Sequence, residues 1–189
     1  MQIRKSLAYG PFIESLYRAA SQSENYLSLF TSTQIKKDLH VEAFLRILAM
    51  SDIYYGKFKS SKQGIKNILD EYGEQKKSES ISEEVISKLF SSLDQLLGFF
   101  EAKKLFRRVN ANRDIEGILN FGILESLLGV MVFGGYKLPN NFNERYINHM
   151  GQLFDGYLLD ESHNPFSTST GSVSSIKKRF EIFEGMLEK

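Results

Sequence analysis

The sequence predicts an all-α fold, an irregular bundle of about seven or eight helices around a buried central helix at residues 115–134. Three observations predict it. The chain has only three prolines and is rich in Leu, Ile, Glu, Lys and Ser. Hydrophobic residues recur at helical spacing in most of its long segments. No run of alternating apolar and polar residues indicates a β-strand, and no segment is repeated.

The segment 115–136, IEGILNFGILESLLGVMVFGGY, predicts the central helix. Apolar residues would cover most of the circumference of this helix, a pattern typical of a helix buried on most sides. Three glycines inside the apolar run lower helix propensity by up to about 1 kcal/mol each, so we interpret them as sites of close approach by neighbouring helices. These glycines are Gly117, Gly122 and Gly129.

A membrane-spanning interpretation of the same segment is rejected. Glu116, Asn120 and Glu125 lie inside the apolar run, and charged groups are costly in hydrocarbon. We therefore expect no membrane association through this helix.

The remaining helices are predicted from hydrophobic spacing and capping signals. Their expected ranges are 3–20 with an interruption at 10–11, 37–55, 61–72, 82–101, 141–154 and 172–187. Ser61 is the expected N-cap of one helix and Asn112 that of the central helix, and Ser80 with Glu83 forms a capping-box pattern. Segments 73–79 and 155–170 are expected to be loops.

Composition limits the function classes. The 189 residues suit a single helical domain, 1–189, that buries roughly 70% of its unfolded surface. A net charge of +1 gives no global attraction to nucleic acid or anionic membrane. The absence of cysteine removes disulfides and thiolate nucleophiles and fits a cytoplasmic location. Residues 1–10 do not lead into a signal-peptide core, so secretion is not expected.

No catalytic, metal or cofactor site is expected. The three histidines have no partner at ligand spacing, and the charged residues between 155 and 163 are interpreted as solvated loop groups. The glycine-containing segments 129–135 and 166–173 lack the lysine of a nucleotide-binding loop. The residues weighed are His40, His149, His163, Asp155, Asp160 and Glu161.

Two basic groups are candidate binding surfaces for nucleic acid or a partner. Their residues are Lys103, Lys104, Arg107, Arg108 and Arg113 in one segment, and Lys177 and Lys178 near the C-terminus. In the first group, the arginines and lysines around Phe106 could hold phosphates. The alternative is that this segment is a charged helix end exposed to solvent. The Ser/Thr run 167–170 either offers groups to a phosphate or caps the last helix. Arg179 lies nearer the buried face and is expected to brace the preceding loop.

Three segments together resemble one family. They are KKDLHVEAFLRILAMSD at 36–52, FRR with the apolar helix at 106–132, and FSTSTGSVSSIKKRFEIFEGML at 166–187. In this order they resemble the helical C-terminal half of the GmrSD-type domain, the ParB-like nuclease-fold module of anti-phage restriction proteins. GPFIESLYRAA, near the start of the chain, fits the helix that precedes the first segment.

The resemblance implies a non-catalytic helical module. The chain has neither the Gln-Arg pair of the ParB-like nucleotide site nor a His-Asn-His arrangement, so nucleotide hydrolysis and DNA cutting are not carried over. The module is expected to dock on a partner that carries the ParB-like half and to aid DNA recognition. Direct nucleic-acid binding, and a helical adaptor or inhibitor with no nucleic-acid role, remain the alternatives. The residues that match the family's polar anchors are Arg46, Arg107, Thr168, Thr170 and Arg179.

Overall fold

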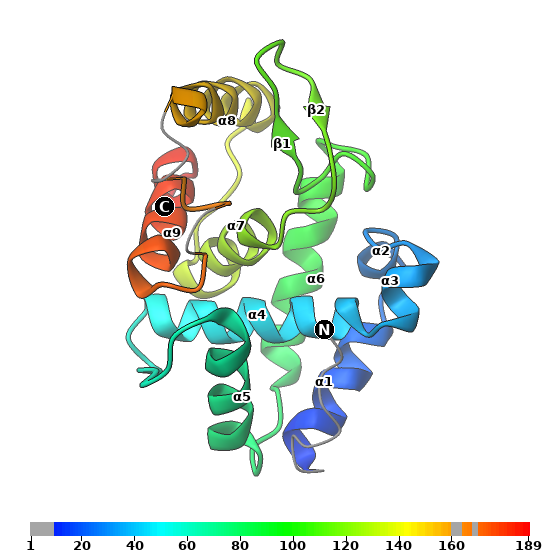
Figure 1. Ribbon diagram of the computed structural model, residues 1–189. Coiled ribbons are helices and arrows are strands. Elements are labelled where there is room, and N and C mark those ends of the chain that lie inside the picture. Colours follow the sequence, from blue (N-terminus) through cyan, green and yellow to red (C-terminus); the bar gives the residue numbers. More distant parts are fainter. Residues whose placement is uncertain (1–9, 160–163, 168–169) are drawn as a thin grey trace.

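Two helices that pack directly on each other form the centre of the structure, a computed structural model that describes residues 10–159, 164–167 and 170–189. Helix α4 (Leu39–Tyr54) runs across the middle of Figure 1, and α7 (Phe121–Gly134) lies against it. The predicted all-α architecture is confirmed. A two-stranded antiparallel hairpin is the one sheet within the described residues.

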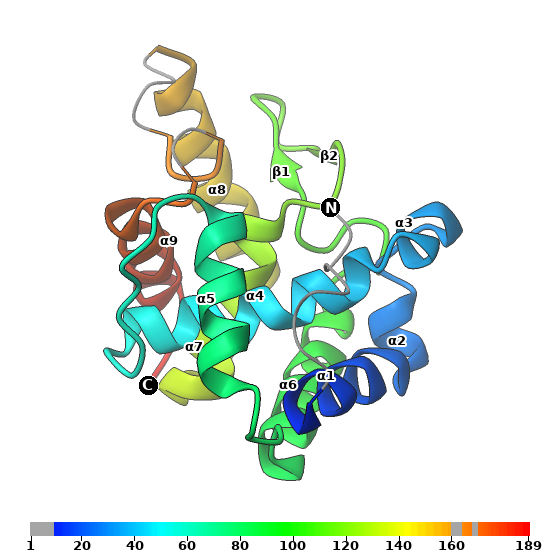
Figure 2. The ribbon, with the colours of Figure 1, turned by 60° about the horizontal axis from the view of Figure 1, so that its bottom comes forward.

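The other elements surround this pair (Figures 1 and 2). Helix α9 contacts α4 and α7, α6 packs on α7, and α1, α3 and α5 pack on α4, while α8 contacts α9 and the hairpin. The bounds of these elements are α1 (Pro11–Ser21), α2 (Glu24–Leu27), α3 (Ser32–Lys36), α5 (Ile65–Lys76), α6 (Glu83–Leu97), β1 (Arg108–Val109), β2 (Ile115–Glu116), α8 (Phe142–Leu159) and α9 (Val173–Met186).

Helix α7 is buried on every side, as the sequence predicts. All residues from Gly122 to Val132 are buried, and Leu124, Leu127 and Val130 are 0% exposed. Helix α4 is buried equally fully, from His40 to Ile53. The core therefore contains two central helices, where the sequence predicted one.

Two glycines of α7 mark close approaches between helices. A Cβ atom on Gly129 would lie 2.5 Å from Ser51 Oγ of α4 and 2.6 Å from Phe180 Cε1 of α9. One on Gly122 would lie 3.0 Å from Arg179 Cδ. The predicted role of these glycines is confirmed. Gly117 differs, because it lies in the turn before α7 with φ +85°, where glycine is favoured.

Two tyrosines at the end of α4 bind α9. The hydroxyl of Tyr54 donates to Glu184 Oε2 at 2.8 Å, and that of Tyr55 donates to Glu184 Oε1 at 3.3 Å. Burial first, and then the nearby Glu184 carboxylate, raise the pKa of both phenols. Both hydroxyls therefore remain donors across the physiological pH range.

The central helix begins later than predicted. Residues 115–116 form β2, paired with β1 in the register Val109–Ile115 and Arg108–Glu116, and α7 starts at Phe121. Its N-cap is Asn120, whose Oδ1 accepts from the Ile123 N–H at 3.2 Å, so the predicted Asn112 cap is wrong. Helical propensity at 115–119 yields to the hairpin because a positive φ at Arg113 and Gly117 turns the chain.

Several other predicted boundaries are wrong. Helix α5 begins after Gly64, because Ser61 binds the Glu71 carboxylate instead of capping the helix. The helix ends at Lys76, inside the predicted loop 73–79. Ser82, not Ser80, caps α6 through the Val85 N–H. Helix α8 extends to Leu159, into the predicted loop. The predicted helical residues 3–9, and loop residues Asp160, Glu161 and His163, lie outside the described residues.

Among the described residues, no helix combines the length and apolar character needed to cross a membrane.

Candidate functional site

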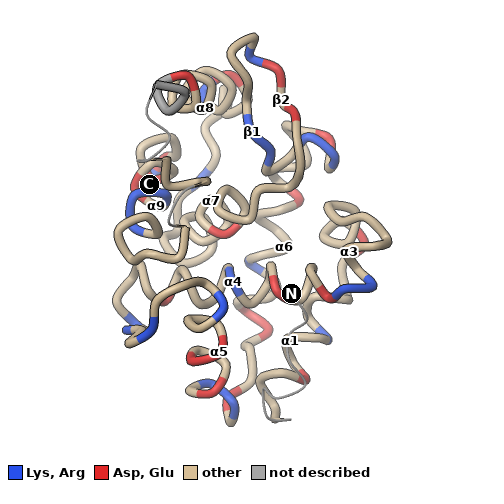
Figure 3. The backbone as a smooth tube through the Cα atoms, in the orientation of Figure 1, with Lys and Arg blue, Asp and Glu red and all other residues tan. Residues whose placement is uncertain are grey.

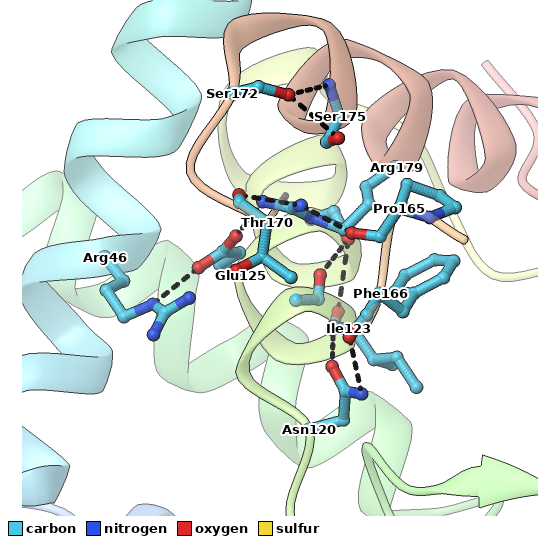
Figure 4. A network of polar contacts seen from close by, with 12 residues as sticks. Arg46, Asn120, Ile123, Glu125, Pro165, Phe166, Thr170, Ser172, Ser175 and Arg179 are labelled. Carbon is cyan, nitrogen blue, oxygen red and sulfur yellow. Dashed lines mark hydrogen bonds and ion pairs between the residues drawn. The ribbon is translucent and has the colours of Figure 1, made fainter. Parts of the chain in front are cut away.

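A carboxylate at the centre of the bundle joins three helices. Glu125 of α7 is 0% exposed. Its Oε2 accepts from Arg46 Nε of α4 at 2.8 Å, and its Oε1 accepts from Arg179 Nη2 of α9 at 2.5 Å (Figure 4). Buried charges require partners of opposite sign and hydrogen bonds, and this arrangement supplies both.

Arg179 extends this network to the segment before α9. Its Nη1 donates to the carbonyl of Pro165 at 2.8 Å and to the carbonyl of Thr170 at 3.1 Å. Its side chain is 0% exposed. The predicted bracing role of Arg179 is confirmed, and the residue is more deeply buried than its position in the sequence suggested. Thr170 takes part through its backbone, while Thr168 lies outside the described residues.

A second carboxylate brings the network to charge balance. Glu42 Oε1 lies 3.8 Å from Arg46 Nη1, one helical turn away on α4. Glu42 Oε2 is buried without a hydrogen-bond partner among the described residues. Burial raises the pKa of Glu42, and the Arg46 charge opposes that shift. The two arginines and two glutamates form a compensated cluster that is held inside the fold.

A pocket of about 480 Å³ adjoins this network at the N-terminus of α7. Arg46 forms one wall, and Asn120, Phe121 and Gly122 at the start of α7 form another. The hairpin and the turn after it contribute further lining, including Arg108 and Glu116, and the segment before α9 contributes Phe166, Ser167 and Thr170. Asn120 links two of these walls, because its Nδ2 donates to the Phe166 carbonyl at 3.4 Å.

The first predicted basic group lies on and beside the hairpin, at the top of Figure 3. Lys103, Lys104 and Arg108 are exposed. Arg107 is partly immobilised, because its Nη1 donates to the Gly117 carbonyl at 2.8 Å and its Nε donates to the Lys103 carbonyl. Arg113 reaches α8, where its Nη1 lies 2.7 Å from Asp155 Oδ2. Three of the five cations are thus exposed, and Arg107 and Arg113 are held by hydrogen bonds or an ion pair.

Acidic residues accompany this basic group. Glu101 lies 3.5 Å from Lys103 Nζ, Asp114 is exposed, and Glu116 stands opposite Arg108 in the hairpin. The surface therefore carries only a modest positive excess. The second group, Lys177 and Lys178, is exposed on α9. Helical spacing in the predicted helix 172–187 would place Val173 inward with Ile176 and Phe180, but Val173 is 43% exposed, so this part of the pattern is wrong.

Sequence reasoning missed the role of Glu125 and the pocket itself. The signal for Glu125 was present, because a charge inside an apolar helix requires a buried partner. Arg46 and Arg179 were both recognised as polar anchors, but nothing local indicated that they meet at one carboxylate. The two histidines within the described residues do not converge: His40 is buried, with its pKa lowered by burial, and His149 is exposed.

Within residues 10–159, 164–167 and 170–189, no group of three or more histidine and acidic side chains is arranged to hold a metal ion. Comparison of the chain with protein-family models, with curated proteins and with solved structures finds no match.

Proposed function

We propose that this chain is a non-catalytic helical module of a GmrSD-like anti-phage or restriction system, active in the cytoplasm. In this proposal it docks on a protein that carries a ParB-like nucleotide-binding half and aids recognition of DNA. One observation carries the proposal. The segments that resemble the family become α4, α7 and α9, which pack together, and Arg46 and Arg179 meet at Glu125.

This convergence supports the resemblance for a physical reason. Three segments separated by long stretches of chain supply one buried, charge-compensated cluster, and such a cluster is stable only if every member is present. A chance similarity of apolar patterns does not require the polar residues of those patterns to meet. Two of the five polar anchors, Arg46 and Arg179, meet here at Glu125 in the core of the bundle.

The test is affinity capture of the tagged chain from its native host, after nuclease treatment of the lysate, followed by mass spectrometry. We expect a protein with a ParB-like domain to be retained, because the proposed contact is between proteins and does not need DNA. Retention that disappears on nuclease treatment contradicts direct docking. Nucleotide hydrolysis or DNA nicking by the purified chain alone contradicts the non-catalytic assignment.

The exposed cations beside the hairpin favour a second candidate, direct nucleic-acid binding. A separate titration tests it. A labelled DNA duplex is titrated with the chain and with the variant Lys103→Glu/Lys104→Glu/Arg108→Glu, each at several salt concentrations. Direct binding predicts affinity that falls steeply with salt and a shallower slope in the variant. The matched control, Lys36→Glu/Lys59→Glu/Lys62→Glu, changes charge equally at exposed positions elsewhere. If neither the chain nor the variant binds the duplex, direct nucleic-acid binding is contradicted, and the capture experiment decides between docking on a ParB-like partner and the adaptor or inhibitor alternative.

A further inference from the structure

The pocket at the start of α7 presents two backbone donors. The first N–H groups of a helix have no partner within the helix. Asn120 satisfies the N–H of Ile123, whereas those of Phe121 and Gly122 have no hydrogen-bond acceptor among the described residues. Both residues line the pocket. The positive end of the α7 dipole adds to the attraction for an anion there.

Arg46 supplies a fixed cationic group to the same pocket. The residue is only 9% exposed, and it lines the pocket. Its Nε is bound to Glu125, and its guanidinium lies 5.0 Å from the centroid of the Phe121 ring. Its Nη1 is 3.8 Å from Glu42, beyond hydrogen-bond length, and its Nη2 has no partner in the part of the chain that the structure describes. Glu125 therefore holds the guanidinium in place, and Nη2 is the donor that remains for a ligand.

The remaining walls combine one exposed cation, Arg108, with apolar surface, and the Arg108 guanidinium lies 5.3 Å from the centroid of the Phe154 ring. Arg108 is exposed on β1, and Glu116 stands opposite it on β2, so the carboxylate partly offsets this charge. Leu119 and Phe166 give apolar lining. Ile118 also lines the pocket and is 84% exposed, so it adds an apolar edge to the pocket.

We propose that this pocket binds a small phosphorylated ligand, with its phosphate at Arg46 and the N-terminus of α7 and its less polar part against Ile118 and Phe166. Arginine and helix N-termini are the usual donors to phosphate oxygens. The volume, about 480 Å³, falls within the range of about 300–1,000 Å³ that is typical of small-molecule sites. This assignment goes beyond the proposed docking function and does not depend on it.

The test uses the isolated full chain, titrated by calorimetry and by amide NMR. The probes are inorganic phosphate, adenosine, adenosine monophosphate, and an oligonucleotide with either a 5′-phosphate or a 5′-hydroxyl end. We expect the probes with a free or terminal phosphate to shift the Phe121 and Gly122 amides, and adenosine to bind far more weakly than its monophosphate. A response to the free monophosphate identifies a nucleotide as the source of the phosphate, and a response only to the 5′-phosphorylated oligonucleotide identifies a strand end.

Three variants separate this site from a general charge effect. Arg108→Gln is expected to weaken adenosine monophosphate binding about tenfold, because it removes a charged donor. Glu116→Gln is expected to tighten binding, because it removes the only carboxylate among the described residues that line the pocket. Lys104→Gln is the control, since Lys104 is exposed nearby but does not line the pocket.

Equal binding of adenosine and its monophosphate overturns the proposal. So does the absence of shifts at Phe121 and Gly122, or an equal loss of affinity in Lys104→Gln and Arg108→Gln. Because only the purified chain and small probes are used, these outcomes are independent of whether a ParB-like partner exists.

Discussion

Replacing Glu125 by leucine is expected to lower the free energy of unfolding by about 3–5 kcal/mol, because it leaves the fully buried Arg179 charge without its carboxylate. A typical domain has a total stability of only about 5–15 kcal/mol, so the variant is expected to be marginally folded. Urea unfolding followed by circular dichroism measures the effect. Glu125→Gln, which keeps an acceptor but removes the charge, is expected to cost less.

A control and a double variant make this prediction specific. Arg18→Ala breaks the Arg18–Glu83 pair, whose side chains are 62% and 74% exposed, and is expected to cost less than about 1 kcal/mol. Adding Arg179→Met to Glu125→Leu removes the unpaired charge, so the double variant is expected to lose less than the sum of the single losses. Additive losses, or a Glu125→Leu effect as small as that of Arg18→Ala, contradict the network.

Gly129→Ala is expected to destabilise the fold by about 1–3 kcal/mol, although alanine is the better helix former. The added Cβ would lie 2.5 Å from Ser51 Oγ and 2.8 Å from Phe180 Cζ, so these two buried side chains must shift within a packed core. The midpoint of thermal or urea unfolding measures the loss. A larger residue at this position is expected to cost more.

Gly185 of α9 provides the matched control. It is an exposed helical glycine, and a Cβ atom there has nothing within 4 Å. Gly185→Ala is therefore expected to leave stability unchanged or raise it by up to about 1 kcal/mol. If Gly129→Ala also stabilises the protein, the close packing of the three helices at Gly129 is wrong.

The fold class and the burial of α7 were predictable because an apolar surface around the whole helix leaves no face for water. The burial of α4 was not predictable in the same way. His40, Glu42, Arg46 and Asp52 give that helix an amphipathic pattern, yet all four are buried. Glu42, Arg46 and Asp52 each have a polar partner supplied by another residue, so their polarity does not require exposure to solvent.

The start of α7 shows a different limit. Ile115 and Leu119 continue the apolar pattern of the helix, and a two-residue strand is too short to show a periodicity of its own. The local signal was Asn120, a good N-cap directly before the longest apolar run. The hairpin depends on the pairing of residues 108–109 with 115–116, which is information about tertiary structure that no single segment contains.

The candidate site was predictable only in part for the same reason. Its individual cations stand out in the sequence, and Arg179 was correctly expected to brace the segment before α9. The pocket arises where α4, the hairpin turn and that segment meet at the N-terminus of α7. This meeting depends on the buried network, whose members lie on three different helices, so composition and spacing within one segment do not reveal it.

Residue-resolved amide hydrogen exchange tests most directly whether α7 is enclosed by α4 and α9 around Glu125. The amides from Leu124 to Val132 are expected to be among the slowest to exchange, opening only with global unfolding, together with those in the middle of α4. The exposed hairpin is expected to exchange much faster. Exchange within α7 as fast as in the hairpin would contradict the account.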